Sequence, residues 1–62
     1  MTAQTIAENY INGNHSEVKR MLGEGGADAV TIAARTMHVY FYLLGIEQTN
    51  FRNWLINNYS DI

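Results

Sequence analysis

Apolar residues along this chain recur every three or four positions, and no stretch alternates apolar and polar residues as a strand does. In residues 2–12, one helical face would carry the apolar side chains Ala3, Ile6, Ala7 and Tyr10. Gly13 follows as a helix stop, and Asn14 with Glu17 three residues later resembles a capping box. The pattern therefore predicts one helix over residues 2–12 and a second that begins after Asn14.

The second and fourth helices are predicted from shorter apolar patterns. Val18, Met21 and Leu22 have helical spacing, and Gly23 follows them as the end of the second helix. The fourth helix is predicted to begin near Thr49, which would act as its N-cap. Its apolar face would carry Phe51, Trp54, Leu55 and Tyr59.

The third and longest predicted helix, from Ala27 to Leu44, has two apolar stripes. The stripe that is expected to face the core consists of Val30, Ala33, Ala34, Met37, Phe41 and Leu44. The other stripe consists of Ile32, Val39, Leu43 and Ile46. A helix with two apolar sides must be covered on both sides, so this helix is predicted to be central, with Phe41 contacting Trp54 of the fourth helix.

The four segments together predict an all-α fold, a compact bundle of four short helices packed around a long central third helix, as one domain over residues 1–62. A chain of 62 residues has room for one small core. Because cysteine is absent, disulfides and thiolate metal sites are excluded. Packing or oligomerisation must therefore supply the stability.

The second apolar stripe is predicted to form a homodimer interface. The other helices have too few apolar residues to cover both sides of the third helix, since the second helix offers only three. Ile56, which lies off the apolar face of the fourth helix, is expected to add to this surface. The predicted interface residues are Ile32, Val39, Leu43, Ile46 and Ile56.

A polar strip on the third helix, between its two apolar stripes, is the predicted contact surface for another protein. It consists of Thr31, Arg35, His38 and Tyr42. Arg and Tyr are enriched in binding hot spots. The alternative is that the strip is the solvated side of the helix, with Asp28 and Arg35 forming a weak surface pair. On either interpretation, replacing Arg35 with alanine is expected to change the stability little.

The remaining side chains argue against catalysis and against a bound cofactor or metal. The two histidines, His15 and His38, lack a metal-type spacing to each other or to a carboxylate on the same helical face. Residues 29–46 are apolar, but Arg35 and His38 near their middle favour a soluble helix over a membrane span. Residues 1–12 are polar and mildly acidic, unlike a secretory signal, so a cytoplasmic location is expected.

These features together favour a small non-catalytic module that binds a larger protein and acts as a homodimer, an accessory or regulatory protein. The stretch from Asn9 to Asn14 resembles the opening of small phage or plasmid proteins, and this resemblance implies a phage or mobile-element type. The alternative is a helix-turn-helix-like regulator that binds nucleic acid through its second and third helices. A net charge of −2 and four scattered basic residues argue against this alternative, because nucleic-acid-binding surfaces concentrate basic residues.

Overall fold

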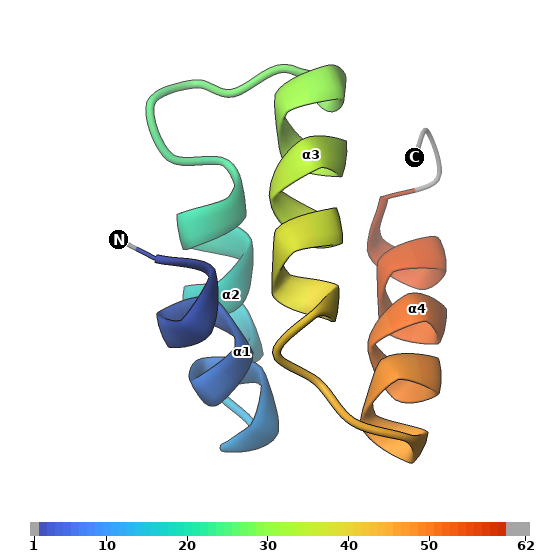
Figure 1. Cartoon of the computed structure of the whole chain (residues 1–62). Helices are drawn as coiled ribbons and strands as arrows, with labels where there is room; N and C mark the ends of the chain where they lie inside the picture. The colour runs from blue at the N-terminus through green and yellow to red at the C-terminus, as the bar shows by residue number, and fades with distance from the viewer. Residues whose placement is uncertain (1, 60–62) are drawn as a thin grey trace.

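The computed structural model describes residues 2–59, which form four α-helices joined by turns (Figure 1). The helices are α1 (Ala3–Ile11), α2 (His15–Leu22), α3 (Ala29–Tyr40) and α4 (Ile46–Asn58). In Figure 1, α3 stands between the α1–α2 pair on one side and α4 on the other. No strand occurs within residues 2–59, so the predicted all-α class is confirmed. The central position of the third helix is confirmed by its place between the other helices.

The N-caps of α1 and α3 are side-chain oxygen atoms in extended residues. The Oγ1 atom of Thr2 accepts a hydrogen bond from the Thr5 backbone N–H at 3.2 Å, and the Oδ1 atom of Asp28 accepts one from the Thr31 N–H at 2.8 Å. These bonds satisfy N–H groups that have no partner within the first turn of a helix. Asn14 is the N-cap residue of α2, as predicted, but its side chain makes no capping bond there.

The third helix is shorter than predicted and the fourth is longer. α3 begins at Ala29 and ends at Tyr40, instead of running from Ala27 to Leu44, and α4 begins at Ile46. Thr49 therefore lies inside α4 rather than capping it. The physical reason is a turn that the apolar pattern did not reveal.

The Gln48 side chain stabilises this turn by bonding back to the end of α3. Its Nε2 atom donates hydrogen bonds to the carbonyl oxygens of Tyr40 and Leu43, at 3.2 and 3.0 Å. Gly45 adopts a φ of 50°, which side-chain-bearing residues rarely tolerate, and there the chain reverses into α4. The carbonyl group of Tyr40, the last residue of α3, thus has a partner outside the helix, and the Leu43 carbonyl group has one in the turn.

The core lies between α1, α2 and one side of α3, and α4 closes it with two side chains. The buried apolar residues are Ile6, Ala7, Tyr10, Val18, Met21, Leu22, Val39, Leu43, Phe51 and Leu55. The predicted inner faces of α1 and α2 are therefore confirmed. Thr36 is the buried polar residue of the described chain, and its hydroxyl donates to the Ala33 carbonyl oxygen at 2.7 Å.

The two apolar stripes of the third helix have the opposite roles to those predicted. Val39 and Leu43, from the stripe assigned to a dimer interface, are 0% and 1% exposed within a single chain. Val30 and Phe41, from the stripe assigned to the core, are 78% and 80% exposed. Both stripes are similarly apolar, so the sequence pattern could not determine which of them would face α1 and α2.

Helix α4 is held to the rest of the chain by aromatic contacts centred on Phe51. The Phe51 ring lies edge-on to Tyr10 of α1, with 5.0 Å between centroids, and 6.3 Å from Tyr40 of α3. Trp54 also contacts Tyr10, at 5.8 Å, and His15 of α2, at 5.4 Å. The predicted partner of Trp54, Phe41, is exposed instead, so that assignment is wrong.

We expect Phe51→Ala to lower the free energy of unfolding by about 3–5 kcal/mol, because it removes a fully buried ring and leaves a cavity between three helices. Phe41→Ala, the matched control, should change it by no more than about 0.5 kcal/mol in dilute solution. Urea denaturation followed by circular dichroism measures both. Equal losses for the two variants would contradict this description of the core.

The Asp28 cap predicts an acid-sensitive contribution to stability. The hydrogen bond from the Thr31 backbone N–H lowers the pKa of Asp28 below its usual value. A carboxyl with a lower pKa in the folded state stabilises the fold above its unfolded pKa, and this contribution is lost as the pH falls through the folded pKa. The thermal midpoint should therefore fall on acidification below about pH 4.

Asp28→Asn should show a smaller fall in the thermal midpoint, since asparagine keeps a cap acceptor that does not titrate in this range. Gln4→Ala is the control, because Gln4 is exposed and carries no titratable group. It should melt with the same pH dependence as the wild type. If Asp28→Asn also keeps the full acid dependence, the cap makes no titrating contribution.

Candidate functional site

Arg35, the charged residue of the predicted polar strip, connects α3 to the end of α2. Its Nη1 atom donates hydrogen bonds to the backbone carbonyl oxygens of Leu22 and Glu24, at 2.8 and 3.0 Å. These carbonyl groups lie where α2 ends and have no partner within that helix. The expected surface pair with Asp28 does not form, since Asp28 caps α3, and the guanidinium group has a structural role.

The rest of the polar strip lies on the surface beside α1. Thr31, His38 and Tyr42 are all exposed. A groove of about 310 Å³ is lined by three residues of the strip and three from the start of α1, namely Arg35, His38, Tyr42, Thr2, Ala3 and Ile6. Thr31 does not line it. The residues from α1 were missed because no pattern in the sequence indicates which helix end would lie beside α3.

A larger uncovered surface lies on the other side of α3. We call it the α3–α4 apolar face, and it consists of Val30, Met37, Phe41, Leu44 and Ile56, each more than half exposed. A groove of about 450 Å³ lies within it, between α3 and α4. The groove is lined by Thr36, Met37, Tyr40, Phe41, Arg52 and Leu55. A smaller hollow of about 250 Å³ shares Arg52 and Leu55 with it and extends to Ile56 and Tyr59.

The predicted dimer interface is divided by the fold. Val39 and Leu43 belong to the core and Ile32 packs against it, so these three residues do not form an outer surface. Ile46 and Ile56 are 68% and 57% exposed. Of the five predicted interface residues, only Ile46 and Ile56 remain largely exposed, and Ile56 belongs to the α3–α4 apolar face; the assignment of Val39 and Leu43 to a dimer interface is corrected.

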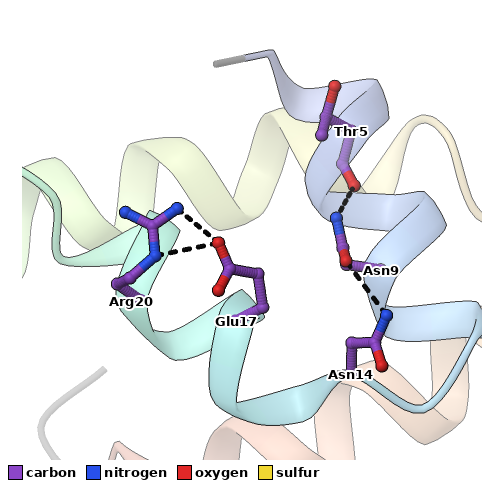
Figure 2. A network of polar contacts seen from close by, with 5 residues as sticks. All are labelled: Thr5, Asn9, Asn14, Glu17 and Arg20. Carbon is purple, nitrogen blue, oxygen red and sulfur yellow. Dashed lines mark hydrogen bonds and ion pairs between the residues drawn. The ribbon is translucent and has the colours of Figure 1, made fainter.

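The basic residues are dispersed, and three of the four have partners within the chain. Arg20 forms an ion pair with Glu17 on α2 (Figure 2), and this contact lowers the pKa of Glu17. The Lys19 ammonium group lies 5.9 Å from the centroid of the Tyr59 ring. Arg35 is bonded to backbone carbonyl groups, and Arg52 lines the α3–α4 groove. No basic patch results.

A chain of polar contacts joins α1 to the start of α2 (Figure 2). The Asn9 Nδ2 atom donates to the Thr5 carbonyl oxygen at 2.9 Å, and the Asn14 Nδ2 atom donates to Asn9 Oδ1 at 3.2 Å. Both amide side chains therefore hold the α1–α2 corner together. This explains why Asn14 does not complete the capping box predicted with Glu17.

The titratable side chains of His15, Tyr10 and Tyr59 belong to the aromatic cluster. His15 stacks on Tyr10 with 4.8 Å between ring centroids. Burial, with a smaller contribution from the Glu47 carboxylate, raises the pKa of Tyr10, and burial raises that of Tyr59. Both phenols therefore remain neutral near pH 7. Within residues 2–59 there is no cluster of three His, Asp or Glu side chains that could hold a metal ion.

None of the helices in the described part of the chain has the length and apolar content needed to cross a bilayer. Comparison with protein-family models, with curated proteins and with solved structures finds no match to this chain. A function must therefore be argued from the surface itself, where the two candidate regions are the α1–α3 groove and the α3–α4 apolar face.

Arg35→Ala should lower the free energy of unfolding by about 1–2 kcal/mol, because it removes two charge-assisted bonds and leaves the carbonyl groups of Leu22 and Glu24 without them. This reverses the sequence-based expectation of a neutral effect. Arg52→Ala is the matched control, since Arg52 forms no ion pair or side-chain hydrogen bond within residues 2–59. It should stay within about 0.5 kcal/mol of wild type in chemical denaturation. A neutral Arg35→Ala would show that the helix junction does not depend on this side chain.

Proposed function

We propose that this chain is a small non-catalytic protein-interaction module that binds through the α3–α4 apolar face. The observation that carries the proposal is the exposure of Val30, Met37 and Phe41 along one side of α3, at 78%, 65% and 80%. Single exposed apolar residues are common on protein surfaces, but a contiguous apolar patch marks an interaction site. Burying such side chains against a partner is favourable by about 25 cal/mol per Å² of apolar area.

The composition of the face is also that of a protein interface. Met and aromatic residues are enriched at the centres of protein interfaces, and charged residues are depleted there. Met37 and Phe41 lie on the same groove, and the one charged side chain in its lining is Arg52. Arginine is itself common at interfaces, where its stem packs against apolar surface.

The helix-turn-helix alternative is not favoured by these positions. The first turn of α3, where a recognition helix would contact bases, begins with Ala29, Val30, Thr31 and Ile32. None of these is a side chain that reads base edges bidentately. The segment between α2 and α3 contains Gly25 and Gly26 at positive φ, and Arg35 is already bonded there to backbone carbonyl groups.

The predicted polar strip remains a second candidate contact for a larger partner. Its exposed members His38 and Tyr42 line the α1–α3 groove, on a different side of α3 from Phe41. Because both side chains are exposed, they can be replaced without disturbing the core. They therefore provide a control surface for the experiment that follows.

A photoreactive phenylalanine analogue placed at Phe41 should cross-link to a discrete protein in cells that express the chain. The same analogue at Asn50, on the exposed side of α4, is the control position and should give no such adduct. The cross-linked protein, which includes a second copy of this chain among its candidates, is then purified and titrated against the wild type. Phe41→Gln should weaken the measured affinity by at least about tenfold, as expected for an interface hot spot.

The double variant His38→Ala/Tyr42→Ala tests the second candidate surface in the same titration. Unchanged affinity would assign binding to the α3–α4 apolar face alone. The proposal is contradicted if Phe41 and Asn50 give equal adducts, or if Phe41→Gln binds the purified protein as tightly as the wild type.

A further inference from the structure

We infer that the occupant of the α3–α4 apolar face is a second copy of this chain, with the two α3 helices antiparallel across a two-fold axis that passes beside Ala34 and Met37. This inference rests on the proposed function, since it names the partner of the same surface. Two-fold dimers are the commonest closed assemblies, and they require a surface that is complementary to itself. Three independent features of the chain meet that requirement.

The first feature is the alternation of large and small residues along the exposed stripe of α3. Around an axis midway between Ala34 and Met37, antiparallel pairing places Met37 of one copy opposite Ala34 of the other. The same register places Phe41 opposite Val30. Each large side chain thus faces a smaller one on both sides of the axis, which allows the two helices to interdigitate. The Val30 side chain of the second copy would lie over the groove beside Phe41.

The second feature is that the stripe has no charge. Its members on and next to α3 are Val30, Ala33, Ala34, Met37, Phe41 and Leu44. A two-fold axis brings residues near their own counterparts, so a charged stripe would place like charges together at a considerable cost. Here no ionised group is desolvated at the axis. Arg52 lies at the α4 side of the groove, where its long stem leaves the guanidinium group free to reach solvent.

The third feature is the size of the surface in relation to the stability of the chain. Large apolar side chains expose roughly 150–200 Å² each, so five of them at 57–81% exposure offer on the order of 600 Å². The two small alanines and the stem of Arg52 bring this close to the roughly 800 Å² that each partner buries in a stable interface. The chain exposes 4056 Å², and the part that the structure describes has a core of ten buried apolar residues. Chains of this length commonly gain stability by oligomerising.

Sedimentation equilibrium of the wild-type chain at high micromolar concentration tests the inference directly. The expected mass is twice 7.0 kDa. Ala34→Lys and Met37→Glu should each weaken self-association at least tenfold, because each places a charge against an apolar partner. Thr49→Glu, on the exposed side of α4, is the control and should leave the mass unchanged. All three positions are exposed or lie at helix surfaces, and circular dichroism should show equal helicity.

The register is tested by mixing the two charged variants. In the proposed arrangement, Lys at position 34 of one copy faces Glu at position 37 of the other, while the second pair of positions in that heterodimer keeps its native Ala and Met. The mixture should therefore recover most of the association that each variant loses alone. The arrangement would be overturned if both variants self-associate as tightly as the wild type, or if mixing them does not restore the association.

The same measurement separates this inference from the proposed function. If the wild type is monomeric while the photoreactive analogue at Phe41 still captures a different protein, the inferred dimer is wrong and the proposed interaction module is supported. An amphipathic helix with an acidic residue opposite Arg52 would be such a partner. If the wild type is monomeric and Phe41 captures no protein, both proposals fail.

Discussion

The hydrogen bonds from Arg35 to the end of α2 are the constraint on which the rest of the structure depends. They satisfy carbonyl groups that α2 leaves without partners, and they hold the Arg35 side of α3 against the end of α2. Ile32 and Val39 lie three residues before and four residues after Arg35, so they share its side of the helix. When Arg35 is held against α2, these residues enter the core, and Met37 and Phe41 are turned outward.

The outward stripe stays uncovered because α4 packs against a different part of the molecule. The Phe51 ring of α4 contacts Tyr10 and Tyr40. The Trp54 ring contacts Tyr10 and His15. The fourth helix stands beside α3, and its rings reach past the end of α3 to side chains of α1 and α2. The groove beside Met37 is the space that remains between α3 and α4. The packing of α4 through Phe51 and Trp54 therefore has two results. It closes the small core, and it leaves the α3–α4 apolar face exposed.

A division of roles between the two sides of α3 follows from this geometry. The side with Arg35 and Val39 is used within the chain, through hydrogen bonds and burial. The side with Met37 and Phe41 is exposed and apolar, and it is the surface through which the proposed module would bind. In the proposed dimer, the two exposed stripes would give each other the cover that the helices of one chain cannot provide.

The sequence by itself determined the class of the fold and the inner faces of its outer helices. A helical period, with Gly13 and Asn14 between segments, was enough to place α1 and α2, because each has one apolar stripe and therefore one possible orientation. The same reasoning identified Phe51 and Leu55 as inward residues of α4. The presence of a helix and the side of it that is apolar are local properties, and apolar residues spaced three to four positions apart indicate both directly.

Only the tertiary structure decided which side of α3 is buried and where α3 ends. Two stripes of similar apolar character give the helix two plausible orientations, and in the observed one Arg35 meets carbonyl groups 11 and 13 residues earlier in the chain. The end of α3 depends in the same way on the Gln48 side chain, which reaches back to Tyr40. Such long-range polar contacts have no period along the sequence. The exposed surface followed from the same arrangement, since Met37 and Phe41 lie on the side of α3 that faces away from the core.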